Sequence, residues 1–125
     1  FEYRRKRGAH LFSKHRYLAA QMQGYLQDGL WLDLARTANE RMARLARGLG
    51  QIPGVTFSTE PHANMLFPRL PRAMHRRLMA QGAYYYLYDG TLEDGPDEAP
   101  ITCRLVCDWS VTDATIDRFL SVARD

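Results

Sequence analysis

Arg104 is the residue of this sequence whose surroundings most directly suggest chemistry. It lies in the middle of a mostly apolar run, TCRLVCDWS, at residues 102–110. Strand alternation places Leu105 and Trp109 on one face of this run, together with the two cysteines, and Arg104 on the other. A guanidinium group is costly to bury unless it meets an anion, and its planar fork can donate two parallel hydrogen bonds to a carboxylate or a phosphate. Arg104 is therefore either an anion-binding residue or a structural arginine, on a half-exposed edge strand or paired with Asp108.

The two cysteines of the chain, Cys103 and Cys107, are four residues apart on the same predicted strand. That spacing points both thiols to one face at a distance too large for a relaxed disulfide. We therefore expect reduced, buried thiols. No histidine stands at ligand spacing from them, so the pattern does not predict a zinc site.

The net charge of +3 is unevenly distributed, because the first sixteen residues are strongly basic and residues 89–125 are mainly acidic. The early basic residues are Arg4, Arg5, Lys6, Arg7, Lys14 and Arg16. A basic patch can bind nucleic acid, an acidic surface or a phosphate-bearing ligand, or it can be a solvated helix face. Tyr3, Phe12 and Tyr17 form no recognisable nucleic-acid-binding frame, so we expect no nucleic-acid partner. We expect no membrane partner either, because no apolar run approaches the length of a membrane helix.

The first half of the chain is predicted to be helical after an irregular start. Residues 3–14 lack an apolar period and contain Gly8, which predicts a loop. From His15 onward, apolar residues recur at helical spacing. They form one stripe: Tyr17, Leu18, Met22, Tyr25 and Leu26. Asp28 and Gly29 are expected to end this helix.

A longer helix is predicted over residues 30–49, with an apolar face and an arginine-rich face. Gly48 and Gly50 are interpreted as its end. Glu40 and Arg44 stand in the favourable i, i+4 order for a salt bridge on its polar side.

Shorter elements follow in the second half. The patterns predict strands at 55–58 and 63–67, a helix from Pro71 to Gly82, strands at 84–88 and 102–110, and a final helix. Pro68 and Pro71 are expected to bracket the exit from the second strand, and residues 89–100 to form a surface loop. Ser110, followed three residues later by Asp113, gives a start signal for the final helix. The apolar face of that helix comprises Ile116, Phe119, Leu120 and Ala123.

This order of elements predicts an α+β domain. We expect a small, mainly antiparallel sheet of three or four strands, covered by helices on one face. At 125 residues the chain can bury one modest core. Because it starts at Phe1 rather than a methionine, we interpret it as a piece of a longer protein.

Three segments together resemble a known family: RRKRGAHLFSKHRYLAAQ at 4–21, ANMLF at 63–67 and RLVCDW at 104–109. They are similar to the C-terminal third of low-specificity L-threonine aldolases, and His10 with the SKHRYLAAQ run is nearest to the phenylserine-aldolase branch. The family belongs to the β-eliminating lyase group of fold type I enzymes, which depend on pyridoxal phosphate. The resemblance implies the small C-terminal domain of an aspartate-aminotransferase-like fold over residues 30–125. Residues 1–29 would then be a connecting segment and a helix from the junction with a large domain.

The resemblance also implies an activity and two site residues. Such enzymes cleave the Cα–Cβ bond of β-hydroxy-α-amino acids to give glycine and an aldehyde. Arg104 matches the arginine that clamps the α-carboxylate of the amino-acid substrate, and Lys6 matches a lysine near the cofactor. Asn64 matches a strand position with an expected structural role. The family's Gly-Gly-Gly-Met-Arg-Gln stretch is replaced here by residues 8–14, so the roles of His10, Lys14 and Arg16 stay open.

Several further expectations follow from the same resemblance. The lysine that binds the cofactor covalently should precede Phe1, in an N-terminal large domain, so this chain would hold no catalytic residue and would be inactive alone. The parent would be a cytoplasmic homo-oligomer, a dimer or a tetramer. Another fold type I lyase or an aminotransferase could use a similar arginine on a similar strand, and a stand-alone basic binding module is the alternative from a different class.

Overall fold

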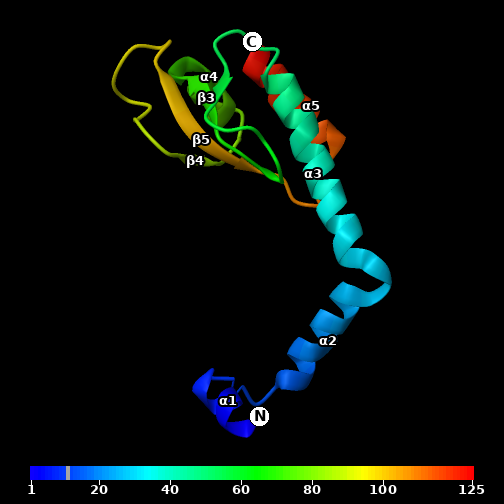
Figure 1. The fold of residues 1–125 in the computed structure, drawn as a ribbon. Coiled ribbons are helices and arrows are strands. Elements are labelled where there is room, and N and C mark those ends of the chain that lie inside the picture. Colours follow the sequence, from blue (N-terminus) through cyan, green and yellow to red (C-terminus); the bar gives the residue numbers. More distant parts are fainter. Residues whose placement is uncertain (11) are drawn as a thin grey trace. The chain divides into compact units, whose positions relative to one another are not determined.

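The computed structural model of the chain describes residues 1–10 and 12–125 (Figure 1). Leu11, which belongs to the segment 4–21 quoted above, lies outside the described residues. The chain divides into two compact units, residues 1–33 and 34–125. In chain order the elements are α1 (Glu2–Arg7), α2 (His15–Leu26), the 3₁₀ helix η1 (Gln27–Gly29), α3 (Leu30–Leu49), β1 (Thr56–Phe57), β2 (Met65–Leu66), β3 (Pro68–Pro71), α4 (Arg72–Ala80), β4 (Tyr86–Leu87), β5 (Pro100–Val106) and α5 (Asp113–Arg124). Within the described ranges, none of these helices combines the length and the apolar character that a membrane span requires.

The first unit begins with a short helix where a loop was predicted. That prediction is wrong for α1, whose glutamate, arginines and lysine are good helix formers that need no apolar face. Lys6 Nζ lies 3.4 Å from Glu2 Oε1, one helical turn away, and Gly8 follows the last helical residue.

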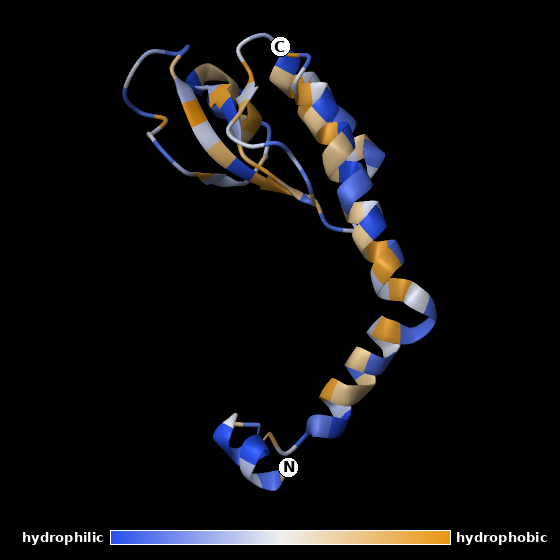
Figure 2. Cartoon of the chain, viewed as in Figure 1, coloured by the Kyte–Doolittle hydropathy of each residue, from blue (hydrophilic) through white to orange (hydrophobic). Residues whose placement is uncertain are grey.

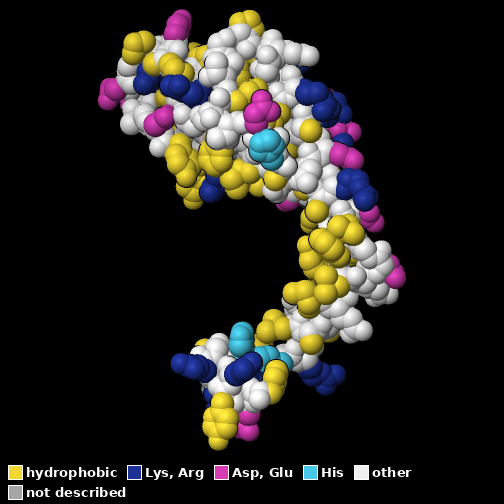
Figure 3. All heavy atoms as spheres, viewed as in Figure 1, with side chains coloured by type: hydrophobic (Ala, Val, Ile, Leu, Met, Phe, Trp, Pro, Cys, Tyr) yellow, Lys and Arg dark blue, Asp and Glu magenta, His cyan; other side chains and the backbone are white. Residues whose placement is uncertain are grey.

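The predicted helix from His15 is confirmed as α2, and its chain direction changes at the expected place. Asp28 and Gly29 have φ angles of 53° and 77°, the left-handed region in which a right-handed helix cannot continue. Figure 2 shows hydrophobic residues along α2, and the side chains of its apolar stripe are solvent-exposed. Figure 3 shows hydrophobic side chains gathered there and on the start of α3.

The second unit is built around β5, the central strand of an antiparallel sheet. β2, β3 and β4 all pair with β5, and β1 pairs with β3. Leu66 pairs with Leu105 and Arg69 with Thr102, so β2 and β3 follow β5 in one continuous register that is interrupted at Phe67. The sheet therefore has five short strands where three or four were expected, and the predicted antiparallel α+β architecture is confirmed.

One face of the sheet carries the core, which it shares with α3, α4 and α5. The alternation predicted for the central strand is correct as far as Cys107: Cys103 and Leu105 on β5, and Cys107 directly after it, are buried on this face. Trp109 is not on that face, because β5 ends at Val106, and it is 60 % exposed.

A tight turn explains why the strand ends early. The Asp108 carboxylate accepts hydrogen bonds from the backbone N–H and the hydroxyl of Ser110 and from the Val111 N–H. These bonds lower the pKa of Asp108, with the Ser110 hydroxyl as the largest cause. Ser110 is consequently not the N-cap that was predicted for α5. The cap is Thr112, whose Oγ1 accepts a hydrogen bond from the Thr115 N–H at 3.2 Å.

Two further features of this unit differ from the expectations. Pro68 and Pro71, expected to bracket the exit from the second strand, are the first and last residues of a strand, β3, because proline is tolerated at strand ends, where the missing backbone N–H costs least. The expected Glu40–Arg44 pair is replaced by contacts between helices. Arg44 lies 2.6 Å from both Asp113 and Asp117 of α5, and Arg41 also contacts Asp113.

Cys103 is buried and reduced, as predicted, and Cys107 likewise. Burial raises the pKa of the Cys103 thiol to about 12, with the nearby Asp89 carboxylate as a second cause. Burial also raises the pKa of Cys107. The folded chain therefore keeps both protons at pH values where the unfolded chain, with an ordinary thiol pKa of 9.0, loses them.

This difference predicts an alkaline loss of stability. The free energy of unfolding should be flat up to about pH 8 and fall as the pH rises through 9 toward 12, by about 1.4 kcal/mol for Cys103 at pH 10. Urea unfolding of the chain at pH 8 and pH 10 measures this fall, and Cys103→Ala should reduce it. Equal stability of the parent chain at the two pH values would contradict the assignment.

Candidate substrate-binding site

Arg104 lies on the face of the sheet that the core leaves uncovered. It stands on β5 between Cys103 and Leu105, which both point into the core, so alternation turns its side chain to the opposite face. β5 is paired along its length, so Arg104 is not on an edge strand. The neighbouring strands give the backbone at Arg104 a fixed position on this open face.

The Arg104 side chain also lacks the structural partner that the sequence offered. Asp108 is held by its own turn, and within residues 1–10 and 12–125 no ion pair includes Arg104. Several other arginines of this unit bind protein acceptors. Arg72, for example, is buried and donates to the carbonyl oxygens of Thr91 and Pro96. Arg104 thus remains able to bind an external anion.

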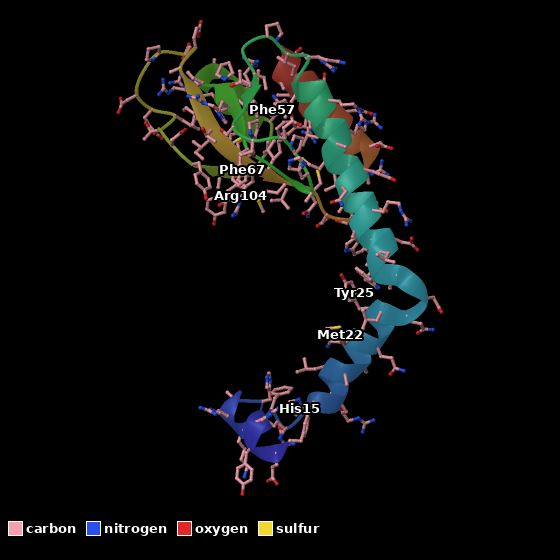
Figure 4. The ribbon with its side chains drawn as sticks, viewed as in Figure 1. His15, Met22, Tyr25, Phe57, Phe67 and Arg104 are labelled. Atoms are coloured by element: carbon pink, nitrogen blue, oxygen red, sulfur yellow. The ribbon has the colours of Figure 1, made fainter. Side chains whose placement is uncertain are left out.

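Aromatic rings frame the Arg104 guanidinium on the open face. Tyr86 stands directly across from it on β4, and Arg104 Cζ lies 5.3 Å from the centre of the Tyr86 ring. On the other side of β5, the register places Phe67, the residue between β2 and β3, level with Arg104 (Figure 4). The Phe67 and Tyr88 rings are in edge-to-face contact, with centroids 5.6 Å apart.

Two hollows open beside this side chain. One has a volume of about 440 Å³, and its walls include Leu105, Val111 and Phe119 as well as Arg104 and Tyr86. The other, of about 390 Å³, is formed by residues 86–88 and Arg104. Arg104 and Tyr86 line both hollows. The walls of the first are mainly apolar and include Leu105, whose side chain points into the core rather than to the open face of Arg104.

Two hydrogen bonds between Asn64 and Cys107 hold the chain at the end of β5. Asn64 Nδ2 donates to the Cys107 carbonyl oxygen at 2.8 Å, and the Cys107 N–H donates to the Asn64 carbonyl oxygen at 2.9 Å. The structural role expected for Asn64 agrees with these bonds, which extend the pairing of β2 with β5 beyond the regular strand.

Lys6 belongs to the first unit and Arg104 to the second. The Lys6 side chain is exposed and pairs with Glu2 on α1. In the same unit, the His15 Nε2 atom lies 3.1 Å from the His10 carbonyl oxygen, and the Arg16 guanidinium lies over the Tyr17 ring. Among the described residues, no cluster of histidine, cysteine and carboxylate side chains could hold a metal ion.

Sequence reasoning selected Arg104 but missed Tyr86 and Phe67. The tyrosine-rich pattern at 84–88 indicated a strand, yet it could not indicate which strand would lie beside it. The register of β4 on β5 alone makes Tyr86 the neighbour of Arg104.

Comparison with known proteins adds family information to this geometry. A low specificity L-threonine aldolase of Pseudomonas aeruginosa is 36% identical over 125 residues, which is all of this chain and 33% of that protein. The chain is homologous to low specificity L-threonine aldolase. A low specificity L-threonine aldolase of a Pseudomonas sp. is 31% identical over 116 residues, which cover 93% of this chain and 31% of that relative. The chain thus spans about a third of the length of these relatives and matches their C-terminal part. No family model matches it.

Solved structures show the same fold. The threonine aldolase of Leishmania major aligns with a TM-score of 0.70 at 22% identity, over 82% of this chain and 28% of that protein. A cystine C-S lyase, in complex with its product cysteine persulfide, aligns with a TM-score of 0.60 at 22% identity. The alignment covers 82% of this chain and 26% of that lyase. An aminotransferase of Streptoalloteichus hindustanus aligns with a TM-score of 0.53 at 19% identity. The alignment covers 74% of this chain and 31% of that aminotransferase. These neighbours confirm the predicted fold type I class, and the aldolase homology implies pyridoxal phosphate as the cofactor of the family.

Proposed function

We propose that this chain is the C-terminal part of a pyridoxal-phosphate-dependent aldolase, in which Arg104 binds the α-carboxylate of the substrate. The parent would cleave β-hydroxy-α-amino acids of the threonine or phenylserine type to glycine and an aldehyde. One observation carries the proposal: in a chain homologous to threonine aldolase, Arg104 projects from the central strand onto an open, aromatic face with no acidic partner among the described residues.

The chemistry of Arg104 suits this role. A guanidinium group binds a carboxylate through two parallel hydrogen bonds, which fix both the position and the rotation of the bound group. With its carboxylate held, an amino acid can present only a narrow range of Cα orientations, so Arg104 would select which bond at Cα is aligned for cleavage. Pyridoxal phosphate, when bound, supplies the electron sink for that cleavage.

The residues of this chain fit the substrate side of such a site better than the covalent anchor of the cofactor. Both lysines, Lys6 and Lys14, are exposed. We place Lys6 near the cofactor as a charged neighbour, since its pair with Glu2 is exposed and readily exchanged for another anion.

We also propose that residues 1–29 connect to a large domain and that residues 30–125 form the small domain. Two features support this division. The core lies within the second unit, whereas α2 exposes apolar side chains, including Tyr17, Met22 and Tyr25, that a monomeric surface rarely gathers. The rest of the parent, or a second subunit of a homo-oligomer, would cover them.

The test is an assay of the full-length protein that contains this chain. Supplied with pyridoxal phosphate, it should convert L-threonine and phenylserine to glycine and the corresponding aldehyde, measured by glycine formation and by aldehyde reduction. The 125-residue chain alone should give no product. In the full-length protein, Met22 should also resist oxidation by peroxide compared with the chain alone.

Two results would contradict the proposal. If the gene encodes no strand-flanked lysine upstream of Phe1, the aldolase assignment is wrong. Transfer of the amino group to a 2-oxo acid, without release of aldehyde, would identify the parent as an aminotransferase instead.

A further inference from the structure

Tyr86 is the side chain most closely associated with Arg104, yet no step of the proposed function uses it. Its ring centre lies 5.3 Å from Arg104 Cζ, within the range of a cation–π interaction. Tyr86 is 67% exposed, so burial does not account for the position of its ring. A contact with a ring face leaves the guanidinium N–H donors available to a carboxylate.

The backbone at Tyr86 is held on both sides by residues that point the other way. Tyr85 packs against the core, and its hydroxyl donates to Nδ1 of the buried His75 at 2.9 Å, while His75 Nε2 donates to the Ile101 carbonyl oxygen. Leu87 also packs against the core and pairs with Cys103. Alternation then leaves Tyr86 on the open face, with little freedom in its backbone.

The next turn of the chain locks the register. The Tyr88 N–H donates to the Thr102 carbonyl oxygen at 2.7 Å, and the Asp89 carboxylate accepts from the Thr102 N–H at 2.6 Å and from its hydroxyl at 2.8 Å. A slip of one residue would break all three bonds and turn Tyr86 into the core. The Tyr86–Arg104 pair is therefore fixed by the sheet rather than by the two side chains alone.

We propose that Tyr86 is a positioning residue for Arg104: its ring holds the guanidinium on the open face in the orientation that receives the substrate α-carboxylate. This inference rests on the proposed role of Arg104 and extends it to a residue of a different strand. Without the ring, the flexible arginine side chain would sample other rotamers, and part of the binding energy would be spent on ordering it.

The expected result is a change in substrate binding with little change in turnover. In the full-length enzyme, Tyr86→Leu should raise KM for L-threonine about three- to tenfold and leave kcat within about twofold. The dissociation constant of glycine, which has no Cα–Cβ bond to cleave, should rise by the same factor when measured from the cofactor absorbance. Tyr86→Phe, which keeps the ring, should stay close to the parent in both measurements.

A double variant separates positioning from a general loss of structure. Tyr86→Leu should have no further effect in an Arg104→Ala background, because the ring then has nothing to orient. Circular dichroism of each variant checks that it is folded.

The outcomes distinguish the two proposals. If Arg104→Ala leaves KM and glycine binding unchanged, the assigned role of Arg104 is wrong, and this inference falls with it. If Arg104→Ala weakens binding but Tyr86→Leu does not, or if Tyr86→Leu weakens binding equally in the Arg104→Ala background, only the positioning role of Tyr86 is overturned. A Tyr86→Phe variant as impaired as Tyr86→Leu would overturn it too, since the hydroxyl rather than the ring would then matter.

Discussion

Arg104→Ala in the full-length protein is expected to raise KM for L-threonine and phenylserine by roughly ten- to 150-fold. A charge-assisted hydrogen bond to a carboxylate contributes about 1.5–3 kcal/mol, which corresponds to that range. The substitution should weaken substrate binding rather than the fold, because the Arg104 side chain lies on an open face and its removal leaves no cavity in the core. Steady-state kinetics with both substrates measures the effect.

The size of the Arg104 effect should depend on the shape of the cation as well as its charge. Arg104→Lys should recover only part of the binding, since an ammonium group cannot form the paired, planar contact. Arg69→Ala is the matched control. Arg69 is an exposed arginine on β3, and its charge acts on Asp89, whose pKa it helps to lower. An Arg69→Ala variant as impaired as Arg104→Ala would indicate a general effect of positive charge and would argue against a specific clamp.

Gly48→Ala is expected to destabilise the second unit by about 1–3 kcal/mol, the usual cost of overpacking a core. Gly48 is buried inside α3, one residue before the helix ends. A Cβ atom there would lie 2.3 Å from Leu120 Cδ1 of α5, much closer than van der Waals contact allows. Leu120 is itself buried, so relief requires α3 and α5 to move apart.

A second helical glycine provides the control. Gly24 lies within α2, and a Cβ added there would meet nothing within 4 Å. Gly24→Ala should therefore leave the second unit unchanged and stabilise α2 by about 0.5–1 kcal/mol, because alanine restricts the unfolded chain. Urea unfolding of both variants makes the comparison. Equal stability of Gly48→Ala and the parent chain would mean that the two helices do not pack as closely as described.

Gly48 also shows where a local signal had a different cause. Gly48 and Gly50 indicate a helix stop in the sequence, and the helix does end at Leu49. Gly48, however, is a helical residue kept small by the close approach of Leu120 from a helix seventy residues later. A helix-ending glycine and a packing glycine are the same letter in the sequence, and only the tertiary contact distinguishes them.

The sequence by itself determined the elements whose patterns are local. The boundaries of α3, the reversal at Asp28–Gly29 and the buried side of β5 at Cys103 and Leu105 followed from periodicity and backbone preference. It also singled out Arg104, because a charge within an apolar run is visible without a structure. The family resemblance, carried by three motifs, is confirmed by the homology to threonine aldolase.

The tertiary structure decided everything that depends on which segments meet. It made β3 a strand despite its two prolines, moved the cap of α5 to Thr112 and directed Arg44 to Asp117 rather than Glu40. Above all, it brought β4 beside β5, so that the Tyr86 ring lies against the Arg104 guanidinium. Strand register is fixed by long-range burial and turn geometry, which single-sequence periodicity does not contain. The arginine could be found in the sequence, whereas the open aromatic face on which it lies exists only in the folded sheet.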